Sequence, residues 1–402
     1  MNKSAAAKNW LKSPGHDAPC PYIILLVIVF ILTGCGTDTP DSVIGTPVIP
    51  ENELPQSDWG TVELIARSEH LSAPIFTDTR NGTIYVWTGS EDGEARHFSQ
   101  GTNGSNQIVA LSANFPIQQQ LFPIDNGALM LWLDRTETSQ DLRLQAGTLN
   151  EGGIAMVGSV SVSDQRTRHY DAIAIDDEQI RIVWSGGLGE VTNLYLHHID
   201  HAARPISGGT VRIDADYPAM IRDNDGIVHL FWLENNGRDA YHARFDDSAP
   251  PVLIDIQRVA SSTIAGTDEI SDFSAAFDGT HVYLFWNIRR TDDSRVVLMS
   301  SGQLSDDRFS TPEIIQTETG ETIQWLSPVR DSQNPLPVVA NQGDNLLLLW
   351  MQDGVLHDSE WIVGSGTLIG LPYIATTNTG VRVSWSQITD NGYANLFTVI
   401  RP

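Results

Sequence analysis

The sequence predicts an all-β fold built from one repeated unit. An apolar strand that follows a turn and ends in tryptophan recurs seven times along the 402-residue chain. Neighbouring copies lie 35 to 64 residues apart, and a period of about 50 residues is typical of solenoids and propellers. No segment of about ten residues shows a helical apolar period, so helices should be scarce. Together these observations predict a seven-bladed β-propeller of four-stranded antiparallel blades.

The first 34 residues are typical of an export signal. All three lysines of the chain, Lys3, Lys8 and Lys12, precede an uninterrupted apolar run over Tyr22–Leu32. That run is shorter than the ~20 residues that a membrane-spanning helix needs, but it suits the apolar region of a signal peptide. We therefore assign residues 1–34 to a signal peptide.

The segment Leu32-Thr33-Gly34-Cys35 resembles a bacterial lipobox. The resemblance implies a lipid thioether on Cys35, cleavage before it, and further acylation with palmitate at the new amino terminus. Gly36, in place of an aspartate, implies the outer membrane of the bacterial cell envelope. An ordinary secretory signal with a chance cysteine is the alternative.

The rest of the chain divides into a tether and one large domain. Residues 35–57 comprise the lipidated cysteine and a proline-rich, polar stretch without apolar periodicity, which is typical of a flexible linker. Residues 58–402 contain all seven repeats and form the predicted propeller.

Composition excludes several function classes. The formal net charge is −26, which leaves no basic surface for nucleic acid. Of the two cysteines, Cys20 lies in the predicted signal peptide and Cys35 is the predicted lipid site, so neither a disulfide scaffold nor a multi-cysteine metal cluster is predicted. Nucleophile-elbow, zinc-helix and P-loop motifs are missing, and we predict no cofactor and no metal.

Each repeat contributes strands in a regular order. A short strand and an Asp-Gly or Asn-Gly turn precede the strand that ends in tryptophan, and a third and a more variable fourth strand follow. The spare strand at residues 61–65 should pair with the last strand, at residues 395–399, and close the ring. The long interval between Trp286 and Trp350 leaves six or eight blades as alternatives. The repeats end at Trp87, Trp132, Trp184, Trp232, Trp286, Trp350 and Trp385.

These repeat tryptophans have a structural interpretation. A large aromatic side chain at the end of each second strand should pack between neighbouring blades, although an aromatic platform for sugars is the alternative. Trp59, Trp325 and Trp361 fall outside the pattern, and we expect them to be more exposed. Trp325 is the better candidate for a ligand contact, because it lies in the long insert.

Two polar motifs favour structural roles. His197 and His198 are adjacent on a strand, so they should face opposite sides and not share a metal with His201. The segment 223–226, Asp-Asn-Asp-Gly, is typical of a hairpin turn, and a calcium loop is the alternative because the later ligands are missing.

Carboxylates at the starts of the innermost strands are the candidate site. The sequences there are His169-Tyr170-Asp171, Asp214-Ala215-Asp216-Tyr217, a segment with Asp272, and Arg330. Acids from separate blades could supply a general acid and a base or nucleophile to a glycosidic bond, and arginine could hold an anionic sugar. The candidate residues are Asp171, Asp216, Asp272 and Arg330; solvated rim charges are the alternative.

The blade rhythm over residues 58–402 is similar to that of the sialidase-like propeller superfamily, in architecture and not in motif. Our leading hypothesis is a non-catalytic, lipid-anchored module that binds a protein or glycan partner. The alternative is a glycan-acting hydrolase or lyase with a funnel-rim carboxylate site. An enzyme should bring several of the acids together with perturbed pKa values.

Overall fold

A computed structural model of the chain separates two units, Met1–Thr46 and Pro47–Pro402. The structure describes residues 59–402 except 69, 72–74, 80–81, 92–93, 101–116, 126, 136–140, 151–158, 162, 164–165, 177, 188–190, 247, 249–250, 265–266, 318–319, 331–332, 364–366 and 389–393. The predicted signal peptide, Cys35 and the tether to residue 57 lie outside the described residues.

All regular elements of the described part are strands. Within it, no helix is long and apolar enough to span a membrane. In chain order the strands are β1 (Glu63–Ser68); β2 (His70–Leu71), β3 (Ile75–Thr79), β4 (Gly82–Glu91) and β5 (Glu94–Gln100); β6 (Ile117–Ile124), β7 (Gly127–Arg135), β8 (Leu142–Asn150) and β9 (Ser159–Ser161); β10 (Thr167–Ala174), β11 (Gln179–Gly186), β12 (Asn193–Asp200) and β13 (Pro205–Arg212); β14 (Asp216–Arg222), β15 (Val228–Glu234), β16 (Asp239–Phe245) and β17 (Leu253–Ser261); β18 (Glu269–Phe277), β19 (Val282–Arg289), β20 (Arg295–Gly302) and β21 (Glu313–Ile314); β22 (Trp325–Pro328), β23 (Leu336–Gln342), β24 (Asn345–Gln352) and β25 (Val355–Val363); and β26 (Thr367–Thr377), β27 (Gly380–Ile388) and β28 (Ala394–Arg401).

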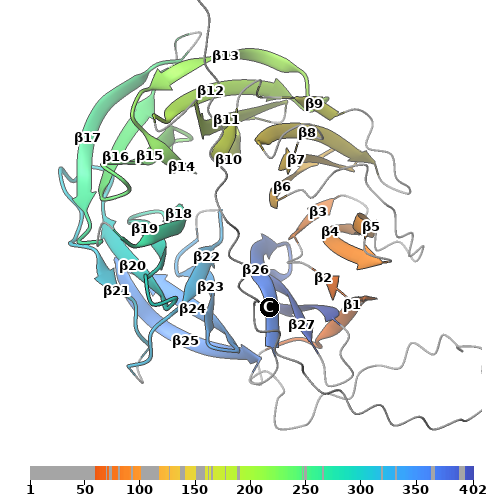
Figure 1. Ribbon diagram of the computed structural model, residues 1–402. Coiled ribbons are helices and arrows are strands. Elements are labelled where there is room, and N and C mark those ends of the chain that lie inside the picture. Colours follow the sequence, from red (N-terminus) through yellow and green to blue (C-terminus); the bar gives the residue numbers. More distant parts are fainter. Residues whose placement is uncertain are drawn as a thin grey trace, which may run out of the picture. The chain divides into compact units, whose positions relative to one another are not determined.

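The strands form antiparallel sheets arranged around a common centre (Figure 1). Each sheet contacts the next one through its innermost strand: β10 contacts β14, β14 contacts β18, β18 contacts β22, and β22 contacts β26. The circle continues through β26 with β3, β3 with β6, and β8 with β10. The predicted all-β propeller with four-stranded antiparallel blades is confirmed.

The prediction of seven four-stranded blades is wrong in number, because six such blades are found. Six sheets have four strands side by side, as in the order β14-β15-β16-β17. In the remaining sheet β2 and β3 both pair with β4, at different positions along it, and β5 pairs with the opposite edge. This sheet is therefore only three strands wide in the described residues, because its inner strand is broken into two short pieces.

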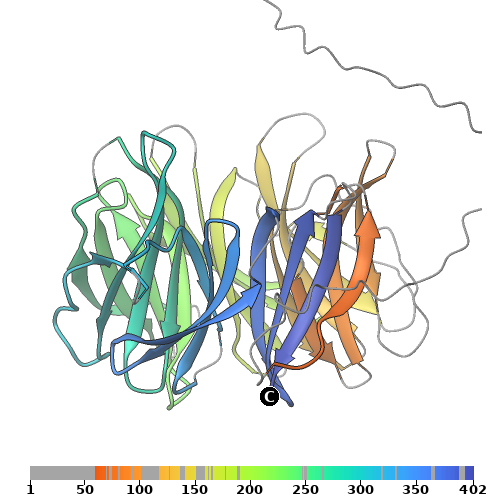
Figure 2. The same ribbon diagram turned by 90° about the horizontal axis from the view of Figure 1, so that it is seen from below.

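The two ends of the propeller meet in one sheet, as predicted. β1 pairs with β28, with Glu63 opposite Thr398 and Ser68 opposite Ala394. In Figure 2 the orange β1 runs beside the blue strands of the C-terminal sheet. The strand begins two residues later than the sequence indicated, at Glu63, and it covers an edge that would otherwise be open to aggregation.

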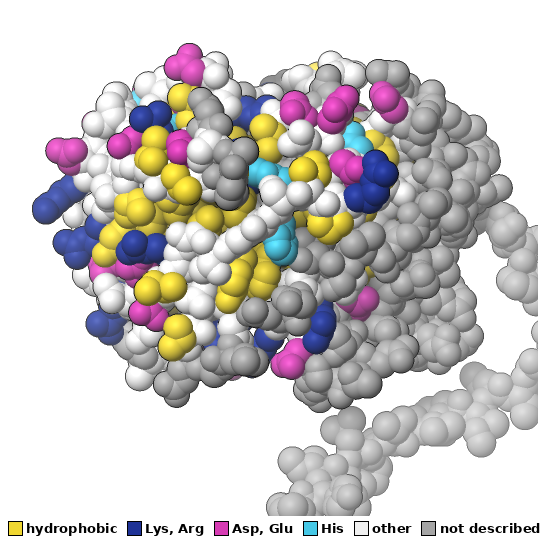
Figure 3. Space-filling model, turned by 90° about the horizontal axis from the view of Figure 1, so that it is seen from above, with side chains coloured by type: hydrophobic (Ala, Val, Ile, Leu, Met, Phe, Trp, Pro, Cys, Tyr) yellow, Lys and Arg dark blue, Asp and Glu magenta, His cyan; other side chains and the backbone are white. Residues whose placement is uncertain are grey.

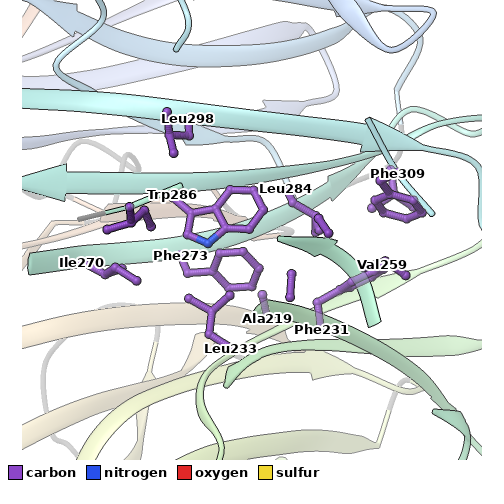
Figure 4. Close-up of a cluster of buried hydrophobic side chains, with 14 of the residues drawn as sticks. Ala219, Phe231, Leu233, Val259, Ile270, Phe273, Leu284, Trp286, Leu298 and Phe309 are labelled. Carbon is purple, nitrogen blue, oxygen red and sulfur yellow. The ribbon is translucent and has the colours of Figure 1, made fainter. Parts of the chain in front are cut away.

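The repeat tryptophans pack between sheets, as their structural interpretation predicted. Trp232 and Trp286 are fully buried, and Trp286 lies among side chains from both β14–β17 and β18–β20 (Figure 4). Trp350 is half-buried and donates a hydrogen bond from Nε1 to Glu360 over 2.9 Å. Such clusters join neighbouring sheets, so each blade depends on the next for its core.

Two of the tryptophans outside the repeat contradict their prediction. Trp59 and Trp325 are only 9 % and 6 % exposed, and both belong to one core cluster. Trp325 is not a loop residue; it begins the innermost strand β22, whose side chains pack against the neighbouring sheet. Trp361 is 40 % exposed, as predicted.

The two polar motifs have structural partners. His197 accepts a hydrogen bond from Trp184 Nε1, while His198 contacts Arg181 and Ser207. The segment 223–226 forms the hairpin turn between β14 and β15, with Gly226 at a φ of 82°. The hairpin interpretation of this segment is confirmed.

Candidate functional site

Five inner strands begin with an irregularity at the same end of the ring. The register of β6, β10, β14, β18 and β26 with the next strand shifts near its first residues. Gln118 in β6 and Tyr217 in β14 take a φ of 51° and 53°, which is unusual for residues other than glycine. Such bulges re-aim side chains, and they are common beside active sites.

An aspartate–histidine pair joins two of these strand starts. His169 Nδ1 of β10 lies 2.9 Å from Asp216 Oδ1 of β14. Burial alone raises the pKa of Asp216, but the hydrogen bond and charge of His169, with hydrogen bonds from Ser185 and the Tyr217 N–H, lower it overall. Asp216 is thus a carboxylate that accepts the Nδ1 proton, and the lone pair of a neutral His169 is on Nε2. Within the described residues Nε2 has no hydrogen-bond partner.

Tyr217 fixes the plane of the His169 ring. The two rings stack with centroids 3.8 Å apart and an interplanar angle of 22°. The Tyr217 hydroxyl donates a hydrogen bond to the Ile270 carbonyl of the next sheet over 2.7 Å. Burial raises the pKa of Tyr217, so its hydroxyl stays protonated and keeps this bond. Tyr217 therefore holds one face of the imidazole, and Asp216 holds its Nδ1 edge.

Asp171 and Arg330 form a second pair, two residues further along β10. Arg330 Nη1 lies 2.6 Å from Asp171 Oδ1, and it also donates to the Ala172 carbonyl. Asp171 accepts further hydrogen bonds from the N–H groups of Ala172 and Met220 and from Gln120 Nε2. Oδ1 accepts three of these four hydrogen bonds and Oδ2 accepts the one from Met220, so Asp171 mainly holds its neighbours in place.

The Asp171–Arg330 pair spans the centre of the ring. Arg330 follows β22, and the sheets of β14 and β18 lie between the sheets of β22 and β10 on the shorter way round. The Arg330 side chain is nevertheless 50 % exposed, and its hydrogen bonds to Gln120, Asp171 and Ala172 all come from Nη1. Among the described residues, Nε and Nη2 have no partner, so this edge can receive a carboxylate in the bidentate manner.

Asp272 of β18 lies near both pairs. Burial raises the pKa of Asp272, against the opposing influences of His169, the Phe273 N–H and Arg330, and the Asp171 carboxylate raises it further. A half-buried carboxyl group with a raised pKa can remain protonated and donate a hydrogen bond. Asp272 therefore differs from Asp216 in that its pKa is raised and not lowered.

The structure places Asp171, Asp216 and Asp272 in the inner strands β10, β14 and β18, whereas Arg330 follows the end of β22. It joins Asp171 directly to Arg330, it brings Asp272 within electrostatic reach of both, and it gives Asp216 to a histidine instead of to another acid. We call His169, Asp171, Asp216, Asp272 and Arg330 the inner-strand site. Sequence reasoning missed the part of His169, although a His or Asp followed by Tyr at two strand starts was the available signal.

No group of three or more histidine, cysteine or acidic side chains in the described part of the chain has the arrangement of a metal site. The inner-strand site instead combines one free imidazole nitrogen, one open guanidinium edge and one carboxyl group of raised pKa. These groups can accept a proton, bind a carboxylate and donate a hydrogen bond, respectively.

Comparisons with known proteins establish the fold. No protein-family model and no curated protein matches the chain. The solved structure of polysaccharide lyase Uly1 is 9 % identical with a TM-score of 0.53, and the match covers 82 % of this chain and 90 % of that one. An ulvan lyase of family PL25 bound to -[GlcA(1-4)Rha3S]- is 9 % identical with a TM-score of 0.52, over 84 % and 95 % of the two chains.

A sialidase of Trypanosoma rangeli in complex with sialic acid also matches, at 8 % identity and a TM-score of 0.47, over 83 % of this chain and 58 % of that one. The two polysaccharide lyase structures, with TM-scores of 0.53 and 0.52, show that the chain has a propeller fold similar to theirs. Identities this low show the architecture alone.

Proposed function

We propose that the protein binds a uronate-containing polysaccharide at the inner-strand site and cleaves it by β-elimination. The observation that supports this most is the His169–Asp216 pair, which leaves Nε2 of an oriented imidazole as a free base. Arg330 supplies an open guanidinium edge for the sugar carboxylate in the same group of residues. A base together with a carboxylate-binding cation is what proton abstraction beside a carboxylate requires.

The proposed reaction uses each group once. Arg330 binds the uronate carboxylate, which makes the neighbouring C5–H more acidic, and Asp272 supplies a carboxyl group of raised pKa beside it. His169 Nε2 takes the C5 proton, a double bond forms between C4 and C5, and the bond from C4 to the glycosidic oxygen breaks. The leaving oxygen takes a proton from the imidazolium or from water. Asp216 stabilises the imidazolium that forms on His169.

Hydrolysis by a pair of carboxylates has less support. Such a mechanism needs one acid of raised pKa and a second, free carboxylate as base or nucleophile. Asp272 suits the first part, but Asp171 accepts four hydrogen bonds and Asp216 is bound to His169 and the Tyr217 N–H. The propeller lyases of similar architecture are compatible with elimination.

The direct test is an elimination assay on the full-length protein in detergent. Polygalacturonate, alginate and chondroitin sulfate are incubated with the protein, and the ultraviolet absorbance of unsaturated uronates is followed. We expect absorbance to rise with at least one acidic polymer and with no neutral glucan, because a neutral sugar has no carboxylate to acidify C5. New reducing ends without absorbance would mean hydrolysis and would exclude elimination.

A non-catalytic binding module is the second candidate, and one observation favours it. Large apolar side chains are exposed in and just after the outer strand β13, where Ile206 and Ile213 are 53 % and 65 % exposed. Figure 3 shows hydrophobic side chains gathered on one face of the molecule. Exposed apolar surface of this kind suits a partner protein. If the acidic polymers bind without any chemical change, this second candidate replaces the lyase.

We also propose that Cys35 carries the lipid that holds the protein on the outer membrane of a bacterial envelope. The lipobox-like segment before it supports this proposal. Metabolic labelling with palmitate should mark the wild-type protein and not Cys35→Ala, which should also leave the membrane fraction. Equal labelling of the two proteins would contradict the anchor.

A further inference from the structure

A second arginine-bearing site lies at the outer edge of the β14–β17 sheet. A pocket of about 230 Å³ opens between the end of β17, residues 258–261, and the loop after β20, residues 308–311. We call it the rim pocket. Its volume is below the ~300–1,000 Å³ typical of drug-sized ligands, so it suits one small group or one sugar unit.

The backbone turns two arginines toward this pocket. The Phe309 N–H donates a 2.8 Å hydrogen bond to the Val259 carbonyl, which ties the loop to β17. Val259 and Phe309 are buried in the same core cluster, as Figure 4 shows. Their neighbours Arg258 and Arg308 are both exposed. Both line the pocket, and the Arg258 side chain is 52 % exposed.

The charge of the rim pocket contrasts with that of the whole chain. The protein has a net charge of −26, yet the lining contains two arginines and no acid. Asp239 lies 3.7 Å from Arg258 and partly neutralises it. Arg308 has no hydrogen bond or ion pair with any residue the structure describes. Ser261 donates its hydroxyl proton to Asp239, so two guanidinium groups beside the Ser310 and Thr311 hydroxyls remain to form a receptor for an oxyanion.

The rim pocket lies at the same end of the sheet as the inner-strand site. Ser261 pairs with Asp239, Asp239 pairs with Glu234, and the adjacent Leu233 pairs with Asp216. These residues form one row across the four strands. At ~4.8 Å between strands, the row places Ser261 about 14 Å from Asp216. A chain molecule that lies across this end of the sheet can reach both sites.

We propose that the rim pocket binds an anionic substituent, a carboxylate or a sulfate ester, of the polysaccharide whose cleaved bond lies at His169. This inference rests on the proposed function and adds the direction of the bound chain, which runs outward across the end of the β14–β17 sheet. Binding at the rim pocket then contributes affinity for long chains and nothing for fragments that occupy the inner-strand site alone.

The test separates binding from cleavage. Full-length protein with His169→Asn, which removes the proposed base, is run in native gels that contain polygalacturonate, with carboxylates only, or chondroitin sulfate, with carboxylates and sulfate esters. R258Q/R308Q is added in the same background. The control R290Q/R295Q removes two exposed arginines at the same end of the neighbouring β18–β21 sheet. All variants are compared by circular dichroism to confirm folding.

We expect R258Q/R308Q to weaken retardation by at least one polymer about tenfold in apparent affinity, because two charge-assisted interactions are lost. The control should stay within about twofold of the parent. Loss in chondroitin sulfate alone would identify sulfate esters as the ligand, and loss in both gels would identify carboxylates. Equal retardation of the two double variants, or no retardation of the parent, would overturn the inference.

These outcomes are independent of the lyase assay. If the wild-type protein cleaves no polymer but R258Q/R308Q still loses retardation, the elimination proposal fails and the rim pocket stands. If cleavage is normal and the double variants do not differ, the rim pocket fails and the elimination proposal stands.

Discussion

Strand β14 has an aspartate–histidine pair at each of its ends, and the two pairs have different surroundings. Asp216 begins the strand and bonds His169 Nδ1 from the neighbouring sheet over 2.9 Å. Asp223 directly follows the strand and bonds His229 Nε2 from the same sheet over 3.1 Å. The first histidine is 22 % exposed in its side chain and the second only 7 %.

The difference lies in the second nitrogen of each histidine. His229 Nδ1 lies 2.9 Å from His242 Nε2, and His242 Nδ1 faces the amide of Gln257. With Asp223 ionised, the donors run in one direction, from Gln257 through His242 and His229 to Asp223. Every ring nitrogen of this buried pair is used, whereas His169 keeps Nε2 free. The same two residue types therefore make a base at one end of β14 and a structural link at the other.

The largest effect is expected when the His169–Asp216 pair is broken. We call it the open pair, because Nε2 of its histidine has no partner among the described residues, and we call Asp223–His229–His242 the closed pair. His169→Asn should lower kcat on a cleaved acidic polymer by about 10²–10⁴-fold, because the general base is removed. The melting temperature should change little, since His169 is partly exposed and its ring is not part of a core cluster. Steady-state elimination rates and thermal unfolding measure the two quantities.

His229→Asn is the matched control, because His229 pairs with Asp223 at the other end of β14. It should leave kcat unchanged and lower the melting temperature, because His229 is buried and hydrogen-bonded at both nitrogens. A loss of turnover in this variant as large as that of His169→Asn would show that the two ends do not have separate roles.

The second effect is a pH dependence of stability to which the buried His229–His242 pair contributes. Burial lowers the pKa of His242 to about 4, with the His229 charge acting in the same direction and Asp255 opposing it. Burial and Arg244 also lower the pKa of His229, although Asp223 opposes them. The unfolded chain therefore binds more protons than the native protein between about pH 6.5 and pH 4, and the free energy of unfolding falls as the pH is lowered through this window.

The expected loss from His242 is roughly 3 kcal/mol at the acid end of the window. Urea unfolding at a series of pH values measures it. His242→Phe should reduce the dependence and leave the part that comes from His198, whose pKa burial also lowers to about 4. His357→Gln, at an exposed position, should leave the dependence unchanged. A wild-type stability that stays constant from pH 7 to pH 4 would contradict the assignment.

The structure at the end of β14 was easier to predict from the sequence than the pairing of residues at its start. The Asp223–Gly226 turn was predictable, because it depends on neighbours in the chain and on a residue that tolerates positive φ. The repeat period and the closing strand were predictable for a similar reason, since burial imposes one pattern on every blade. The narrow sheet of β2–β5 was not, because the break in its inner strand leaves the apolar pattern around Trp87 intact.

The inner-strand site was predictable only as a location. Acids at strand starts indicated that Asp171, Asp216, Asp272 and Arg330 would gather, but their pairing depends on bulges such as the one after Asp216. Arg330 reaches Asp171 from a sheet far away in sequence, and no local pattern encodes such a contact. The same limit explains Trp325, whose burial depends on Trp59 and Val329 of the core cluster around it.

A smaller effect on the free energy of unfolding is expected when the Asp223 carboxylate is altered. Asp223→Asn keeps an oxygen for the turn, where Oδ1 accepts from the Asp225 and Ile227 N–H groups. It places an amide opposite His229, so the donor order of the buried chain must reverse or one bond must be lost. The expected cost is about 2 kcal/mol of unfolding free energy. Asp216→Asn, at the open end, should lower kcat and leave stability within about 0.5 kcal/mol.

The smallest effect concerns the turn that positions Asp223. Gly226→Ala should cost about 1 kcal/mol, because Gly226 has a φ of 82° and an added Cβ meets no atom within 4 Å, so that backbone strain is the only penalty. Gly209→Ala in β13 is the matched control, because its Cβ would also meet nothing and its φ is not in the left-handed region. That control should be neutral or slightly stabilising. Equal urea midpoints for the two variants would contradict the prediction. They would mean that the turn at residues 223–226 does not depend on the positive φ of Gly226 to position Asp223.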